Sequence, residues 1–187
     1  MKKLFKRLIL FVLVIAVLLG AAYYGAKALY PVKYIDYINK YAQEYDIDPY
    51  FVMSIIKAES NFKTEAVSNK NATGLMQITE ETAIWIADKL EIDDFEYEND
   101  ISDPELNIRM GSYYIAYLID MYDGCEDCAL AAYNAGFSNV DRWLSDEKYS
   151  EDGKALDKIP FPETERYVNK VKNNYKIYKF LYKEATD

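Results

Sequence analysis

The 187-residue sequence contains no histidine and only two cysteines. Without histidine the chain can form neither a Ser-His-Asp or Cys-His catalytic site nor a histidine-based zinc site. Two cysteines alone cannot complete a structural zinc site either. Glycine-rich phosphate-binding loops of the GxxxxGK[ST] or GxGxxG type are also absent from the sequence. Any catalysis by this chain would therefore depend on carboxylates, hydroxyls and amides.

Acidic residues outnumber basic ones, and the excess lies after position 30. Five of the 22 Lys and Arg residues and none of the 31 Asp and Glu residues occur in the first 30 positions. Residues 31–187 therefore carry 17 basic and 31 acidic residues, a net charge of −14. A nucleic-acid-binding protein needs a basic face for phosphate groups. The sequence thus argues against nucleic acid as a partner.

The N-terminus joins a short basic segment to a long uncharged one. Residues 1–7 include four Lys or Arg residues, and residues 8–26 are 19 consecutive residues without a charge. At about 1.5 Å per helical residue, this run nearly spans a hydrocarbon core of about 30 Å. The basic flank predicts a cytoplasmic N-terminus, with the remaining chain on the outer side of the cytoplasmic membrane.

Two interpretations of this N-terminal segment are open. A cleaved signal peptide would use residues 8–19 as its apolar region and Ala26-Lys27-Ala28 as its cleavage site. A retained anchor is favoured by tyrosines of the kind found at membrane interfaces, namely Tyr23, Tyr24 and Tyr30. We therefore predict a basic cytoplasmic stub and transmembrane signal-anchor over residues 1–30, and one folded domain over residues 31–187.

The two cysteines form a Cys125-Glu126-Asp127-Cys128 segment. Outside the cytoplasm such a pair favours a local disulfide that tightens a loop. Two free thiols without a role are the alternative. A redox-catalytic pair is disfavoured, because no thioredoxin-like strand and helix pattern surrounds the segment.

Helical signals dominate residues 31–187. Asp48-Pro49 and Asp103-Pro104 each place a capping residue before proline at the first helical position. Thr79 and Ser138 are expected to cap two further helices, and Gly136 to close the helix before it. The sequence predicts helices near residues 35–45, 50–59, 80–90, 104–121, 127–134, 138–144 and 162–185, with little β pattern.

Glu59 lies at the end of the predicted 50–59 helix, on the same face as Ile55 and Ile56. A carboxylate on such an apolar face is costly unless it is paired or protonated. Burial raises its pKa, which is what a general acid requires near neutral pH. The spacing alone fits a salt-bridged or solvent-facing helix-end carboxylate at least as well.

Three ordered blocks place Glu59 in a larger pattern. The first joins Ala58-Glu59-Ser60 to Gly74-Leu75-Met76-Gln77, with Gln77 eighteen residues after Glu59. The second is the ALAAYNAG sequence at residues 129–136, and the third is residues 159–164 followed by Tyr167-Val168. Together these blocks resemble the transglycosylase-type, goose-lysozyme-like catalytic domain of soluble lytic murein transglycosylases, over about residues 33–182.

This resemblance implies a mainly α, α+β lysozyme-like fold: a single compact helical domain with a substrate cleft. It implies peptidoglycan as substrate, cut at the β-1,4 bond between N-acetylmuramic acid and N-acetylglucosamine. Glu59 would be the only catalytic residue. It would protonate the glycosidic oxygen and then take a proton from the muramic acid 6-hydroxyl, which leaves a 1,6-anhydro end. No metal or organic cofactor is implied.

The resemblance carries over further positions one at a time. Ser68 would hydrogen-bond the muramoyl region, and Tyr133 would place its hydroxyl near Glu59. For the others a role in turns or core packing is an open alternative. The full set of implied substrate-binding residues is Ser68, Met76, Gln77, Tyr133, Asn134, Glu163 and Tyr167.

The sequence departs from the family pattern at three places. Thr79-Glu80 stands where an apolar residue and proline are usual, and Glu165 separates Thr164 from Arg166. Asn71 replaces a usual glycine, which a left-handed backbone tolerates. These departures concern substrate preference rather than Glu59.

The expected protein is a membrane-anchored lytic transglycosylase outside the cytoplasmic membrane, or a secreted one if the N-terminal segment is cleaved. Its expected partners are peptidoglycan glycan strands and the cytoplasmic membrane, in the service of wall growth or of an assembled cell-wall or secretion machinery. Three alternatives are open: a hydrolytic muramidase of the same fold, a non-catalytic glycan-binding scaffold, and a helical membrane protein that docks partners.

Overall fold

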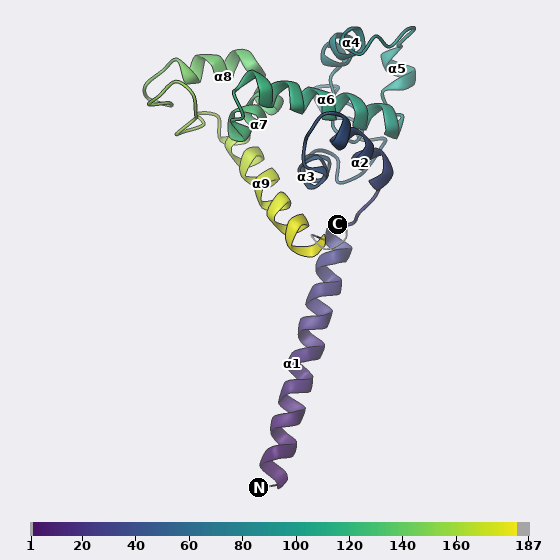
Figure 1. Cartoon of the computed structure of the whole chain (residues 1–187), viewed down its shortest axis with the longest axis vertical. Coiled ribbons are helices and arrows are strands. Elements are labelled where there is room, and N and C mark those ends of the chain that lie inside the picture. Colours follow the sequence, from purple (N-terminus) through teal and green to yellow (C-terminus); the bar gives the residue numbers. More distant parts are fainter. Residues whose placement is uncertain (1, 183–187) are drawn as a thin grey trace. The chain divides into compact units, whose positions relative to one another are not determined.

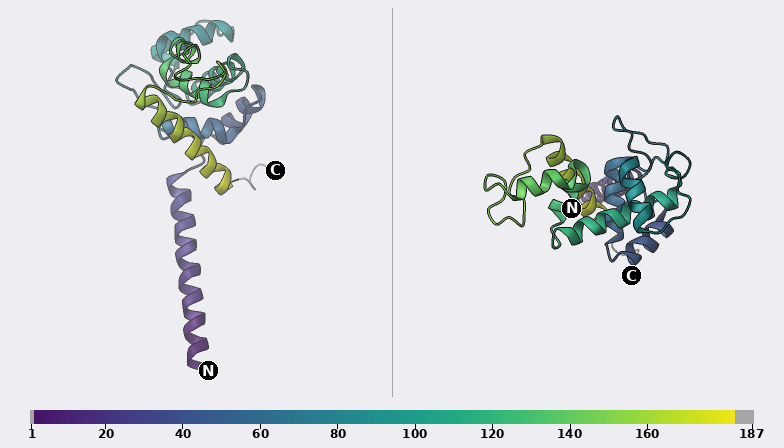
Figure 2. Two further views of the ribbon diagram at one scale, coloured as in Figure 1. Left: turned by 90° about the vertical axis from the view of Figure 1, so that its left-hand side faces the viewer. Right: turned by 90° about the horizontal axis from the view of Figure 1, so that it is seen from above.

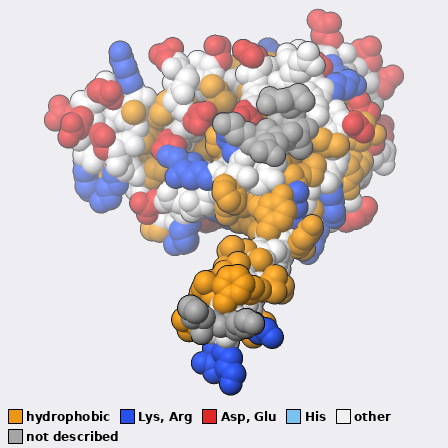
Figure 3. All heavy atoms as spheres, turned by 60° about the horizontal axis from the view of Figure 1, so that its bottom comes forward, with side chains coloured by type: hydrophobic (Ala, Val, Ile, Leu, Met, Phe, Trp, Pro, Cys, Tyr) orange, Lys and Arg blue, Asp and Glu red, His pale blue; other side chains and the backbone are white. Residues whose placement is uncertain are grey.

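A computed structural model describes residues 2–182, apart from the Lys2 side chain. The chain divides into two units, Met1–Val32 and Lys33–Asp187, whereas the sequence pattern predicts the boundary after residue 30. The first unit is a single helix, α1 (Lys2–Leu29). By length and composition its segment Lys3–Leu29 could cross a membrane. Figure 3 shows apolar side chains covering α1 and basic side chains at its N-terminal end.

The second unit is built from helices, as the sequence predicts. No strand occurs among the described residues 33–182; two isolated bridges join Thr73 to Val67 and to Ile78. Its helices are α2 (Ile35–Glu44), α3 (Pro49–Glu59), α4 (Glu80–Lys89), α5 (Tyr97–Asp100), α6 (Pro104–Met121), α7 (Glu126–Ala135), α8 (Phe137–Leu144) and α9 (Pro162–Tyr182). α6 runs across this unit, with α7 and α8 at one end and α4 and α5 at the other (Figure 1).

Local capping chemistry sets three helix starts. The Asp48 and Asp103 side chains each accept a backbone N–H at 2.8 Å, at the starts of α3 and α6. Thr79 does the same for α4 at 3.4 Å. Each cap satisfies a backbone donor that has no partner within the helix. These three predicted starts are confirmed.

The predicted cap at Ser138 is wrong. α8 begins at Phe137, with Gly136 in the N-cap position and no side-chain cap, so Ser138 lies inside the helix. Gly136 has a φ of 86°, which a residue with a Cβ rarely adopts, and this allows α7 to end and α8 to begin at the same residue. The predicted helix end near Ala185 lies outside the described residues.

α3 forms the centre of the core. Eight of its eleven residues are buried, and Val52, Ile55 and Ile56 are fully inaccessible to solvent. α9 packs along α3 and α7, and α2 packs against α3 and α6 (Figure 2). The apolar sequence of α3 is therefore enclosed by other helices, and its C-terminal end at Glu59 is fixed by the surrounding core.

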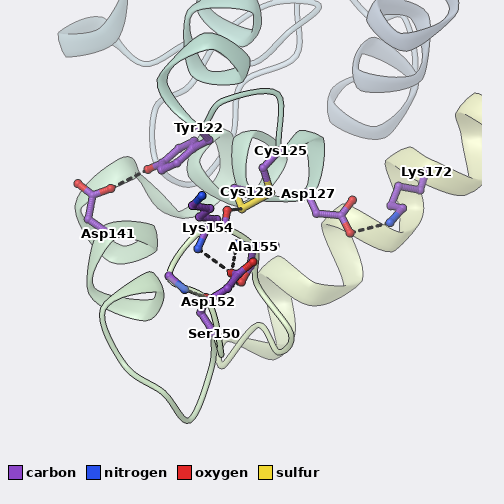
Figure 4. The surroundings of a disulfide bond; sticks show 11 residues. Tyr122, Cys125, Asp127, Cys128, Asp141, Ser150, Asp152, Lys154, Ala155 and Lys172 are labelled. Carbon is purple, nitrogen blue, oxygen red and sulfur yellow. Dashed lines mark hydrogen bonds and ion pairs between the residues drawn. A yellow bond between two sulfur atoms is a disulfide. The ribbon is translucent and has the colours of Figure 1, made fainter.

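A disulfide between Cys125 and Cys128 closes the start of α7 (Figure 4). Cys125 occupies the N-cap position, and its Sγ accepts the Cys128 backbone N–H at 3.2 Å. One turn of α7 is also tied to α9, because Lys172 donates to Asp127 at 2.6 Å. These contacts fix the N-terminal half of the helix that carries Tyr133 and Asn134 in its last turn.

Candidate active site

The Glu59 carboxyl group lies at the C-terminal end of α3, surrounded by protein, in a residue that is only partly exposed. Burial disfavours the ionised form and raises the carboxyl pKa from 4.5 to about 7. The neighbouring Tyr167 hydroxyl, Lys170 and Lys70 oppose the rise, because each favours the carboxylate. Near neutral pH, Glu59 therefore exists in both its protonated and its ionised forms.

Two tyrosines from different helices flank this carboxyl group. Burial, and after it the charge of Glu59, raise the pKa values of Tyr133 on α7 and Tyr167 on α9, so both stay protonated. The Tyr133 hydroxyl donates to the Met76 carbonyl oxygen at 2.8 Å. The buried Tyr167 hydroxyl has no hydrogen-bond partner in good geometry among the described residues, and the Glu59 carboxyl group lies next to it.

The segment between α3 and α4 is held by hydrogen bonds from two sides. Ser60 donates its hydroxyl to the Leu75 carbonyl oxygen at 2.8 Å. Asn107, fully buried on α6, accepts the Met76 backbone N–H at 2.8 Å and donates to the carbonyl oxygens of Thr73 and Ile101 at 3.1 and 2.9 Å. These bonds fix the Gly74–Gln77 turn against α6.

Close packing explains two glycines at this turn. Gly74 has a φ of 88°, and an added Cβ would meet the Asn107 Cγ at 2.7 Å. At Gly111 on α6, an added Cβ would lie 2.7 Å from the Met76 Cβ. Asn71 adopts a φ of 58°, so the predicted left-handed conformation is confirmed.

Ser68 and Gln77 both organise this segment. The Ser68 oxygen accepts the backbone N–H groups of Lys70 and Ala72 at 3.2 and 3.1 Å, and its own proton has no acceptor among the hydrogen bonds of the described residues. The Gln77 amide nitrogen donates to the carbonyl oxygens of Ala66 and Gly74 at 2.8 and 2.9 Å. The Gln77 nitrogen is therefore engaged by the protein, and the substrate contact predicted for Ser68 stays a prediction.

The other predicted residues lie in different environments. Met76 is fully buried, so only its backbone reaches the polar part of the site. The Asn134 side-chain oxygen accepts the Thr164 hydroxyl at 2.9 Å and thereby joins α7 to α9. Glu163 is exposed in the first turn of α9. Substrate contact by these three residues stays a prediction.

A pocket of about 250 Å³ lies beside Gln77, Tyr133 and Asn134. Glu163 does not line this pocket. Its walls come from the end of the α3–α4 segment and from α4, α6 and α7. Gln77, Thr82, Tyr114, Tyr133 and Asn134 are among the lining residues. Glu59 does not line this pocket, but Tyr133 does, and the charge of the Glu59 carboxyl group raises the pKa of Tyr133.

Two contributors to the site carry no recognisable signal in the sequence. Lys170 on α9 donates to the Ala58 carbonyl oxygen at 2.6 Å and thereby places a cation next to Glu59. Lys70 lies near Glu59 as well. No local pattern marks Lys170, because its partner is 112 residues away. Among the described residues, no group of three His, Cys, Asp or Glu side chains could hold a metal ion.

Residues 36–156 match the family model described as the transglycosylase SLT domain. The soluble lytic murein transglycosylase of Salmonella typhimurium is 34% identical over 143 residues, which are 76% of this chain and 22% of that protein. The membrane-bound lytic murein transglycosylase C of Edwardsiella ictaluri is 30% identical, over 79% of this chain and 46% of that protein. The chain thus spans less than half the length of these relatives.

Solved structures show the same fold. The 70 kDa soluble lytic transglycosylase of Escherichia coli aligns with a TM-score of 0.74 and 27% identity, over 83% of this chain and 25% of that one. It has also been solved in complex with bulgecin A. An inactive glutamate-to-glutamine mutant of a Pseudomonas aeruginosa lytic transglycosylase aligns with a TM-score of 0.71 and 29% identity, over 81% and 24% of the two chains. The predicted lysozyme-like helical fold is confirmed.

Proposed function

The chain belongs to the transglycosylase SLT domain family, and from this premise we propose that it is a membrane-anchored lytic transglycosylase of peptidoglycan. Its substrate is the β-1,4 bond between N-acetylmuramic acid and N-acetylglucosamine. Its product carries a 1,6-anhydromuramic acid end. The observation that carries the proposal is the buried Glu59 carboxyl group with a pKa of about 7.

A pKa of about 7 suits one residue to two successive proton transfers. The protonated carboxyl group of Glu59 donates its proton to the glycosidic oxygen as the bond to the anomeric carbon breaks. The resulting carboxylate then takes the proton of the muramic acid 6-hydroxyl, whose oxygen attacks the anomeric carbon. Glu59 ends in its protonated form, so the reaction consumes no water and leaves the enzyme unchanged.

The surroundings of Glu59 support this single-carboxylate scheme. Glycosidases that hydrolyse their substrate ordinarily use two carboxylates, one of them to activate water or to act as a nucleophile. Within residues 2–182, the groups that influence the Glu59 pKa are Tyr167, Lys170 and Lys70, and none is a second carboxylate. The inactive Pseudomonas aeruginosa mutant, in which glutamine replaces a glutamate, agrees with an essential glutamate in this family.

The neighbouring hydroxyls have distinct roles in the proposal. Tyr167 hydrogen-bonds the Glu59 carboxylate once the proton has been transferred, since its hydroxyl has no other hydrogen-bond partner among residues 2–182. Ser68 donates its hydroxyl proton to the muramoyl group. Tyr133 holds the Met76 carbonyl and so fixes the turn that forms one side of the pocket.

The location of the enzyme is part of the proposal. α1 anchors the chain in the cytoplasmic membrane, with its basic end in the cytoplasm and residues 33–187 outside. Its length and composition support this, as does the similarity to membrane-bound transglycosylases. Resistance of the full chain to extraction from membranes by alkaline carbonate, together with an intact mass of 21.7 kDa, would support the anchor. A shorter mature chain released into the medium would show a cleaved signal peptide instead.

The activity test uses the full chain in detergent micelles with purified peptidoglycan. Released muropeptides are identified by mass spectrometry for the wild type, Glu59→Gln and the control Glu65→Gln, which changes an exposed carboxylate in the next segment. The proposal predicts anhydro-muropeptides from the wild type and the control and none from Glu59→Gln. Reducing-end products would favour a muramidase. Binding without release, unchanged by Glu59→Gln, would favour a scaffold.

A further inference from the structure

Charge is unevenly distributed between α9 and the rest of the second unit. The sequence from Arg166 to Tyr182 has five Lys or Arg residues and no Asp or Glu. Residues 31–165 have 11 basic and 29 acidic residues, a net charge of −18. Most of α9 therefore carries charge of the opposite sign to that of the domain it belongs to.

The exposed side of α9 ends in an apolar side chain between two lysines. Asn169, Asn173, Lys176 and Phe180 are exposed at intervals of four, three and four residues, so they share one side of the helix. Phe180 is 83% exposed, more than any other large apolar side chain between residues 33 and 182. The Lys179 side chain beside it is 44% exposed. We call Lys176, Lys179 and Phe180 the α9 end.

This combination of side chains fits the surface of a lipid bilayer. A phenylalanine ring can enter the boundary between headgroups and acyl chains, while neighbouring lysines keep their ammonium groups among the headgroups. Anionic headgroups attract such lysines. The α9 end offers both features on a domain that is otherwise acidic.

The chain itself keeps the second unit close to the membrane proposed for α1. Only five residues connect the end of α1 at Leu29 to the start of α2 at Ile35. Fully extended, this connection reaches about 20 Å. Figures 1 and 2 show the chain entering α2 and the C-terminal end of α9 on the same side of the second unit. The α9 end thus belongs to the side from which the connection to α1 leaves.

The α9 end lies at the end of α3 that is farther from Glu59. Lys179 is 3.5 Å from Asp48, which caps the start of α3. Lys170, earlier on α9, donates to the Ala58 carbonyl oxygen at the other end of α3. α3 has 11 residues, so its two ends are separated by about 15 Å.

We propose that the α9 end is a docking surface for a bilayer that contains anionic lipids, and that docking directs Glu59 away from the membrane. The inference rests on the location given in the proposed function, because α1 has to hold the domain near a bilayer. Within about 8 Å of an anionic surface, the acidic remainder of the domain is repelled and α9 is attracted. The Phe180 ring stabilises the docked state by leaving water. The docked domain presents its Glu59 side to glycan strands beyond the membrane.

The test measures how accessible Lys176 is in the full chain reconstituted in vesicles. One set of vesicles contains phosphatidylcholine alone, and the other contains phosphatidylglycerol as well. A membrane-impermeant ester acetylates exposed lysines, and peptide mass spectrometry gives the rates at Lys176 and at Lys89, an exposed residue on α4. We expect acetylation of Lys176 to be about tenfold slower on the anionic vesicles and that of Lys89 to be equal on both. High salt should remove the difference.

Two matched variants separate docking from a general effect of surface charge. Phe180→Ser and Ile84→Ser each remove an exposed apolar side chain, 83% and 54% exposed respectively, so neither disturbs the core. Phe180→Ser should lose most of the protection of Lys176, and Ile84→Ser should keep it. Equal acetylation of Lys176 on both kinds of vesicle, or full protection in Phe180→Ser, would overturn the proposal.

The remaining outcomes keep this proposal distinct from the proposed function. Protection of Lys176 on both kinds of vesicle that grows with protein density would assign the α9 end to a second copy of the chain and overturn lipid docking. A chain that resists alkaline carbonate and releases anhydro-muropeptides, but shows equal acetylation, keeps the proposed function and loses the docking surface. Lipid-dependent protection in a chain that releases no anhydro-muropeptides would do the reverse.

Discussion

Glu59 is the central residue of the proposed reaction. The pKa of its carboxyl group results from burial, which raises it, and from three neighbouring side chains, which lower it. The loss of hydration raises the carboxyl pKa, and Tyr167, Lys170 and Lys70 limit the rise to about 7. Full ionisation would leave no acid for the first step of the proposed reaction. A still higher pKa would make the protonated carboxyl group a weaker acid and slow its proton transfer to the glycosidic oxygen. The opposing effects of burial and of the three neighbouring side chains on the Glu59 pKa are therefore part of the proposed mechanism.

The pH dependence of catalysis should report this balance. The protonated form is needed first, so kcat/KM should fall about tenfold per pH unit above about pH 7. Lys170→Met removes a cation that lowers the Glu59 pKa, and should move this alkaline limb to higher pH. Lys176→Met, an exposed change on the same helix, is the matched control. A limb that moves to lower pH in Lys170→Met would contradict the assignment.

The same pKa makes a prediction about stability. Its rise from 4.5 to about 7 on folding means that the folded state holds the proton more tightly. The contribution of Glu59 to the free energy of unfolding is complete below about pH 4.5 and is lost as the pH rises through about 7. At pH 8 the ionised carboxyl group destabilises the folded wild type, and Glu59→Gln removes this charge. The free energy of unfolding of Glu59→Gln, measured by denaturant unfolding at pH 8, should therefore be about 3 kcal/mol larger than that of the wild type. Equal free energies of unfolding at pH 8 would show that the carboxyl group is not buried as described.

At the scale of elements, the turn before α4 depends on contact with α6. Gly111→Ala would place a Cβ against the Met76 Cβ and displace the turn that carries Gln77. We expect a loss of about 1–3 kcal/mol in the free energy of unfolding, with reduced kcat. Gly25→Ala on α1, where an added Cβ meets nothing within 4 Å, is the control. A Gly111→Ala variant with wild-type unfolding and turnover would show that the close approach of α6 does not hold the turn.

The disulfide at the start of α7 closes a very short loop. A cross-link over so few residues removes little entropy from the unfolded chain, so its stabilisation should be about 2 kcal/mol. The Cys125→Ser, Cys128→Ser double variant should therefore melt a few degrees lower and still release products, since Glu59 lies on another helix. Thermal unfolding by circular dichroism checks the first point. A complete loss of activity with normal folding would instead give the cysteines a direct role.

Elements differ in how well the sequence predicts them. α3, α4 and α6 begin at capping residues whose chemistry is local, so Asp48, Thr79 and Asp103 reveal them. α8 starts one residue before its predicted cap, because Gly136 is both the predicted end of α7 and the N-cap of α8. The four-residue α5 is too short to show a helical period, so the sequence does not predict it.

At the scale of the whole molecule, the site is assembled from segments far apart in the chain. The resemblance names Glu59 and its partners, but the environment of Glu59 depends on Lys170, which is more than a hundred residues away. Asn107 likewise anchors a backbone 31 residues before it. Such long-range contacts follow from packing of α6 and α9 and leave no local sequence signal.

The acidic charge of residues 31–187 also belongs to this scale. A net charge of −14 gives the domain no long-range attraction to an anionic cell wall. Under the proposed function, membrane anchoring compensates by keeping the domain near its substrate. Replacing α1 by a cleavable signal peptide should therefore reduce wall cleavage in cells severalfold, while the kcat/KM of purified protein stays unchanged. Equal cleavage by both forms, measured as muropeptide release, would show that the anchor has no such effect.

The central claim is that one carboxyl group, Glu59, cleaves the glycan without consuming water. The most direct test digests peptidoglycan with the full chain in water enriched in the heavy oxygen isotope and examines the new muramic acid ends by mass spectrometry. We expect anhydro ends without isotope label, and no such ends from Glu59→Gln. Reducing ends that carry one labelled oxygen would show that water attacks the anomeric carbon, and would contradict the claim.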